Sequence, residues 1–61
     1  MSPTPNRRQR LASDTRRAVG MMRAVLVDAE RAGAEVPIGV TASVEVWRSW
    51  AERLQEEAEE E

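Results

Sequence analysis

The sequence predicts an all-α protein, an antiparallel hairpin of two helices over residues of about 7–32 and 41–58. Apolar residues recur at intervals of three and four through both segments, which places them along one side of a helix. Pro37 and two glycines lie between the segments and predict a connection there. The chain has no cysteine and no histidine, so neither a disulfide nor a zinc site is expected to hold the fold together.

The length of 61 residues is near the lower limit at which one chain buries enough surface to fold alone. Ordering about 40 helical residues costs roughly 60 kcal/mol of conformational entropy. The two tryptophans contribute about 4 to 6 kcal/mol each when buried, and most other apolar residues are Ala or Val. We therefore expect the hairpin to be stabilised by a partner, either a second copy or a larger protein.

Residues 1–6 contain Ser-Pro and Thr-Pro steps and are expected to form a flexible arm. Asn6 followed by Gln9 resembles a capping box, which predicts a helix start near Arg7, while Ser13 or Asp14 offers a later start. From there to Ala32 no proline interrupts the helical pattern. The apolar stripe of this helix is predicted to contain Leu11, Ala18, Met22, Leu26 and Ala29, flanked by Thr15, Val19 and Val25.

Two glycines have predicted roles in or after this helix. Gly20 lies in its middle, where it weakens the helix and suggests the close approach of another helix. Gly33 is a natural residue to end it. The connection from Gly33 to about Thr41 includes the apolar Val36, Ile38 and Val40. We expect this loop to pack against the helix ends, and an exposed binding edge is the alternative.

Thr41 or Ser43 is predicted to cap the second helix. Its apolar stripe has spacings of 4, 3, 4, 3 and 4 and contains Val40, Val44, Trp47, Ala51, Leu54 and Ala58. Trp47 belongs to this stripe and is predicted to lie in the core. The acidic residues 59–61 are expected to fray, because the C-terminal end of a helix disfavours negative charge.

Charge is divided between the two halves of the chain. Up to Val25 there are six arginines and one acid, a charge of +5, and beyond it three arginines and ten acids, a charge of −7. In an antiparallel hairpin the basic start of the first helix lies beside the acidic end of the second. This complementarity favours the antiparallel topology, although each exposed pair contributes only about 0 to 1 kcal/mol.

The residue inventory argues against an enzyme. Histidine, cysteine, lysine and tyrosine are all absent, which removes the usual general bases, nucleophiles and soft metal ligands. No glycine-rich phosphate loop is present. We therefore expect no catalysis, cofactor, metal or small-molecule substrate. No apolar run is long enough to span a membrane and no signal segment is apparent, so the chain is expected in the cytoplasm.

The function predicted from these features is protein–protein interaction, through a self-associating hairpin that forms a homodimeric four-helix bundle, or through a small accessory subunit that docks on a larger protein. Trp50 flanks the stripe and is expected at an intermolecular contact, with coverage of the loop near Ile38 as the alternative. The predicted interface consists of Met22, Leu26, Val44, Val46, Trp47, Trp50 and Leu54.

The arginine-rich N-terminal segment suggests an alternative function. Its arginines could contact phosphates in a small nucleic-acid-binding regulator, with the acidic tail competing for them. The residues concerned are Arg7, Arg8, Arg10, Arg16 and Arg17. No helix-turn-helix, ribbon or zinc pattern accompanies them, and the sequence pI is about 5.1.

Overall fold

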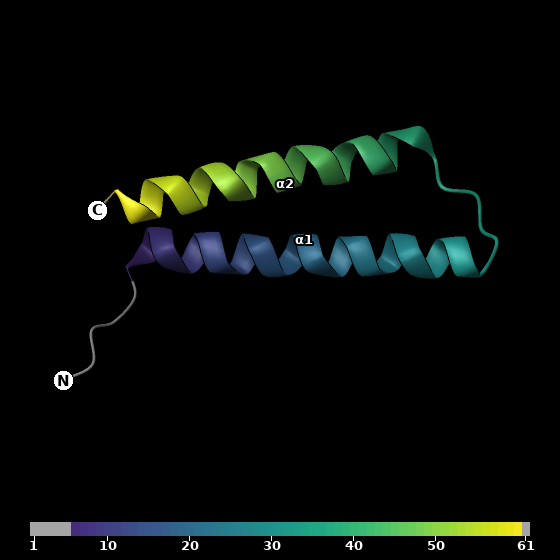
Figure 1. Cartoon of the computed structure of the whole chain (residues 1–61), viewed down its shortest axis with the longest axis horizontal. Helices are drawn as coiled ribbons and strands as arrows, with labels where there is room; N and C mark the ends of the chain where they lie inside the picture. The colour runs from purple at the N-terminus through teal and green to yellow at the C-terminus, as the bar shows by residue number, and fades with distance from the viewer. Residues whose placement is uncertain (1–5, 61) are drawn as a thin grey trace.

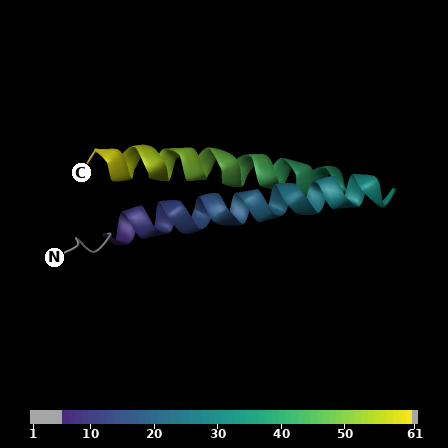
Figure 2. The same ribbon diagram turned by 60° about the horizontal axis from the view of Figure 1, so that its bottom comes forward.

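A computed structural model describes residues 6–60 as two α-helices, α1 (Arg7–Arg31) and α2 (Ile38–Glu59), packed side by side in opposite directions (Figures 1 and 2). The predicted all-α hairpin is confirmed. Of the predicted flexible arm, residues 1–5 lie outside the described range. Asn6 is the N-cap of α1, and Glu59 of the predicted acidic tail is the last residue of α2.

Both ends of α1 are capped as the sequence predicts, and the helix starts at Arg7. The Gln9 amide donates to the Asn6 side chain at 2.7 Å, and the Asn6 amide donates to the Gln9 side chain at 3.2 Å, which completes a capping box. At the other end Gly33 has φ 70°, with its amide bonded to the Glu30 carbonyl. The Ala34 amide bonds to the Ala29 carbonyl, so the helix ends in a Schellman motif.

The start of α2 differs from the prediction. The helix begins at Ile38 rather than near Thr41, with Pro37 as the N-cap and no side chain capping it. Proline is tolerated there because the first turn has no intrahelical acceptor for its amides. Ile38 and Val40 therefore belong to the helix, and both are exposed rather than packed against the helix ends as predicted. Trp50 does not cover Ile38, which is 87% exposed.

The core of the hairpin is thin and made of small side chains. α1 buries Ala12, Thr15 and Val19 against α2, which buries Val44, Ala51, Leu54 and Ala58. The Thr15 hydroxyl donates to the Leu11 carbonyl at 2.7 Å, so this buried polar group is satisfied. The molecule measures 49 × 21 × 11 Å and forms a single layer of helices. Stable domains normally bury their apolar surface between two layers.

Three predictions about packing are wrong in detail. The buried line of α1 runs through Ala12, Thr15 and Val19, so Leu11 of the predicted stripe is turned to the flank and 44% exposed. Trp47 is not a core residue, since 37% of it is exposed. Gly20 also does not mark a close approach, because a Cβ placed there would meet nothing within 4 Å.

Candidate protein-interaction surface

The two helices leave a groove on each side of their contact line, and the two grooves differ in chemistry. One has a volume of about 460 Å³ and is lined by Met22, Val25, Leu26, Gly39, Val40, Ser43 and Val44. The other is lined mainly by charged residues, among them Arg16, Arg23, Arg48, Glu52 and Glu56. Since each residue turns a helix by about 100°, residues 22 and 25 lie on the opposite side of the contact line from residues 16, 20 and 23.

The first groove is part of a larger apolar surface that runs along one side of the hairpin. Leu11 and Ala18 continue it along α1 at helical spacing, and Trp47 and Trp50 continue it along α2 from Ser43. We call this surface the apolar face. Its members are Leu11, Ala18, Met22, Val25 and Leu26 of α1, with Val40, Ser43, Trp47 and Trp50 of α2.

The tryptophans form a contact pair on the apolar face. Their ring centroids are 5.4 Å apart and their planes are inclined by 69°, an edge-to-face arrangement. Trp47 is 37% exposed and Trp50 is 40% exposed. Tryptophan is enriched at the centres of protein interfaces, and these two indoles are exposed beside an apolar groove. The pair is therefore typical of an interface centre.

The predicted interface residues occupy three kinds of position. Met22 and Leu26 are half-buried in the groove, and the tryptophans lie beside it. Val44 and Leu54 are buried between the helices and support the apolar face from beneath, and Val44 also lines the groove. Val46 is exposed at the margin of the apolar face, with Trp47 and Trp50 between it and the groove. Sequence reasoning missed Val25 and Val40 as interface residues, although both follow the spacing of their neighbours.

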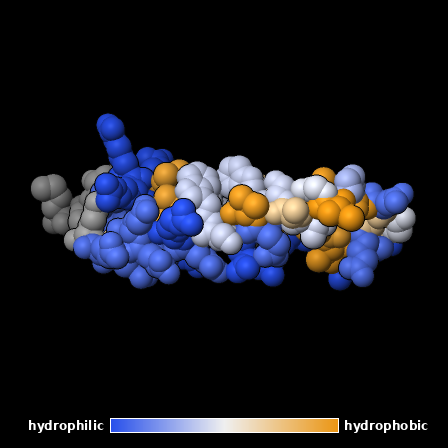
Figure 3. All heavy atoms as spheres, turned by 90° about the horizontal axis from the view of Figure 1, so that it is seen from above, coloured by the Kyte–Doolittle hydropathy of each residue, from blue (hydrophilic) through white to orange (hydrophobic). Residues whose placement is uncertain are grey.

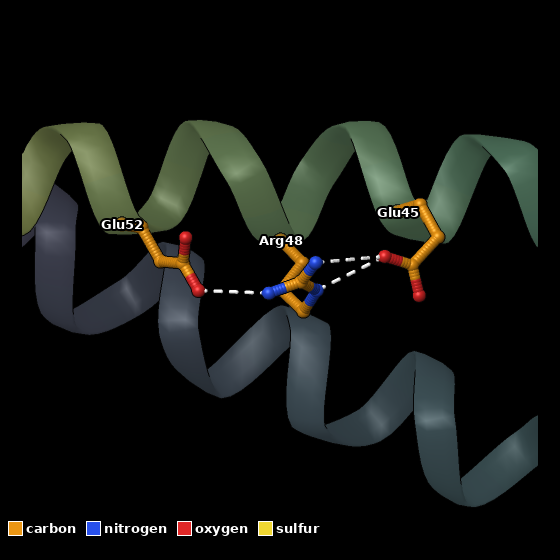
Figure 4. Close-up of polar contacts among 3 residues, drawn as sticks. All are labelled: Glu45, Arg48 and Glu52. Atoms are coloured by element: carbon orange, nitrogen blue, oxygen red, sulfur yellow. Dashed lines mark hydrogen bonds and ion pairs between the residues drawn. The ribbon is translucent and has the colours of Figure 1, made fainter.

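The opposite side of the hairpin, which we call the polar face, contains the charged groove, and several of its side chains bond to one another. Arg48 lies between Glu45 and Glu52 on α2, with its Nη2 3.0 Å from Glu45 and its Nη1 2.8 Å from Glu52 (Figure 4). The hydrogen bond and charge of Glu45, followed by the charge of Glu52, raise the pKa of Arg48 above its ordinary value. Arg16 reaches across from α1 and donates to the Gln55 side chain at 3.4 Å.

The arginine segment does not form a single basic surface. Its five arginines are all exposed within the first half of α1. At about 100° per residue, Arg10 and Arg17 lie on the outer side of α1, whereas Arg16 lies in the polar groove with Glu52, Glu56 and Glu59. Arg16, one of the five predicted phosphate contacts, therefore lies beside acidic side chains, and the other arginines do not share one side of α1.

Within residues 6–60, no group of three or more acidic side chains is arranged to hold a metal ion. Neither α1 nor α2 combines the length and apolar character that crossing a membrane requires. Comparison of the chain with protein-family models, with curated proteins and with solved structures gave no match.

Proposed function

We propose that this chain is a non-enzymatic protein-interaction module that docks through its apolar face. The observation that carries the proposal is the exposed Trp47–Trp50 pair beside the groove formed by Met22, Val25 and Val40. Burying one tryptophan removes 150 to 250 Å² from water, a gain of about 4 to 6 kcal/mol. The partner is a second copy of the chain or a larger protein to which it serves as an accessory subunit.

The contrast between the two sides of the hairpin supports this assignment. On the polar face, Arg48 is already bonded to Glu45 and Glu52, and Arg16 to Gln55. Removing those charged groups from water would cost free energy that an apolar partner could not return. On the apolar face, every member except Ser43 has an apolar side chain, so contact with a partner removes mainly apolar surface from water. The preferred docking side is therefore the apolar face.

Position-specific photo-crosslinking tests the proposal, with a matched pair of sites on α1. Val25 lines the apolar groove and is 64% exposed, whereas Val27 is turned to the polar side and is 46% exposed. A photoreactive phenylalanine analogue at Val25 is expected to give one discrete crosslinked product, either with the purified chain or in an extract of the cells that produce it. The same analogue at Val27 is expected to give no product in either sample. Equal products at both positions, or no product at either, would contradict a docking role for the apolar face.

A further inference from the structure

We infer that the apolar face is covered by the same face of a second copy, with both loops at the same end of the resulting four-helix bundle. This inference rests on the proposed function and names its partner. The argument has three steps, which concern the direction of the apolar stripes, the area of the face and the placement of charge.

The apolar stripe of each helix is displaced from the line that the hairpin buries. In α1 the line of Ala12 and Val19 has Leu11, Ala18 and Met22 on one side of it and Arg16 and Arg23 on the other. In α2 the line of Val44 and Ala51 likewise has Trp47 and Trp50 on one side and Arg48 and Glu52 on the other. Both displacements are toward the apolar face. In a four-helix bundle each helix packs against two neighbours, so its apolar stripe is centred between the two contact directions. The stripes of α1 and α2 are displaced in this way, from the line between the two helices toward the open apolar face.

The area of the face matches a dimer interface. A 25-residue helix is about 37 Å long, and two helices of about 10 Å diameter side by side give this whole side of the hairpin, its charged end included, an area of roughly 700 Å². A standard stable interface buries about 800 Å² on each partner. A second hairpin has the same length and the same apolar face, so it covers this surface without leaving either face exposed, and a two-fold axis closes the assembly.

The distribution of charge and apolar residues selects the relative direction of the two copies. Exposed apolar side chains of the apolar face lie toward the loop at Val25 and Val40, whereas the end with the termini carries Arg7 and Arg10 on α1 and glutamates on α2. Figure 3 shows this change along one side of the molecule, which is mainly hydrophilic near the termini and more hydrophobic toward the loop.

With the loops at the same end, the two-fold axis runs along the bundle and places α1 of one copy against α2 of the other. The loop halves then bury their apolar groups against each other. The arginine-rich start of α1 lies beside the glutamate-rich end of the partner's α2, where opposite charges attract. With the loops at opposite ends, Val25 and Val40 would face the charged end of the partner. The first arrangement satisfies both kinds of contact.

Two measurements on the purified full chain test the inference. Sedimentation equilibrium is expected to give twice the chain mass of 6.9 kDa. Because the chain has no cysteine, Glu35→Cys adds a single site for a spin label in the loop. With the loops at the same end, double electron–electron resonance is expected to give a separation below about 25 Å between the two labels, since neighbouring helices lie about 10 Å apart. If the two loops were at opposite ends of the bundle, the labels would be separated by at least the helix length, about 37 Å.

Each contrary result has a distinct meaning. A strictly monomeric chain, or labels separated by the length of a helix, overturns the inference. A monomeric chain whose Val25 analogue crosslinks to a different protein leaves the proposed function standing while removing the second copy. Val25→Asp is expected to weaken self-association at least 10-fold and Val27→Asp to leave it unchanged. Spin labelling at residue 35 retains every residue of the apolar face, so it tests the arrangement even where Val25→Asp prevents folding.

Discussion

Trp47 and Trp50 contact each other edge to face at 5.4 Å, yet more than one third of each residue remains in contact with solvent. Each ring therefore covers part of the other while presenting a large apolar edge outward. The pair orients both indoles on one side of α2, next to the groove formed by Met22, Val25 and Val40.

Trp50→Ala is expected to weaken association by about 2 kcal/mol, which is about 30-fold, because truncating a central aromatic anchor has this effect at protein interfaces. Sedimentation equilibrium of the variant measures the dissociation constant. Val27→Ala is the control, since Val27 is exposed outside the apolar face, and it should leave the constant unchanged. Equal effects of the two substitutions would argue against a docking role for Trp50.

The melting temperature of the unaltered chain is expected to rise with concentration. When folding and dimer formation are coupled, a 100-fold change in concentration changes the free energy of unfolding by about 2.7 kcal/mol. At about 4 to 8 °C for each kcal/mol in a domain of this size, the melting temperature should shift by at least about 10 °C. Circular dichroism at several concentrations measures it. A constant melting temperature would indicate a hairpin that folds alone.

Gly20→Ala is expected to raise the free energy of unfolding by about 0.5 to 1 kcal/mol. Alanine has the higher helix propensity, and a Cβ at this position meets no atom within 4 Å. Gly33→Ala should have the opposite effect and destabilise by about 1 kcal/mol, because φ at Gly33 is 70° and a Cβ is strained there. Chemical denaturation of the two variants at one protein concentration compares them. Destabilisation by Gly20→Ala would show that another helix does approach this position.

Asn6→Ala is expected to cost about 1 kcal/mol, because the Gln9 amide loses its acceptor when the capping box is broken. Amide hydrogen exchange should become faster at Gln9 and in the rest of the first turn of α1. Ser13→Ala is the matched control, since Ser13 is an alternative cap in the sequence but lies exposed within the helix. If Ser13→Ala were the more damaging change, α1 would begin later than Arg7.

Local sequence signals were sufficient to predict most of the fold. Asn6 with Gln9 indicated the earlier of the two predicted starts of α1, which is the one observed, and Gly33 predicted its end, because caps depend on residues within one turn of each other. The spacing of Val44, Ala51, Leu54 and Ala58 also predicted the buried side of α2. These features depend on periodicity and short-range hydrogen bonds, which are readable without knowledge of the neighbours.

The remaining errors arise where the packing neighbour decides the outcome. The stripe predicted for α1 was centred near Met22, but within one hairpin the side facing α2 is buried, and that side carries Ala12 and Thr15. The start of α2 was placed too late because Gly39 and Pro37 were both assigned to the loop, although a helix tolerates either residue at its first positions.

The bare N-terminus of α2 bears on the order in which the two helices form. α1 has a hydrogen-bonded cap at its start, and a Schellman motif and Arg31 at its end. In contrast, α2 starts at Pro37 without a side-chain acceptor and lacks a base in its last turn. An isolated α2 peptide should therefore be mostly unfolded in water, and α1 should serve as the template on which α2 condenses. Substitutions in α1 should then slow refolding, and those near the start of α2 should mainly accelerate unfolding.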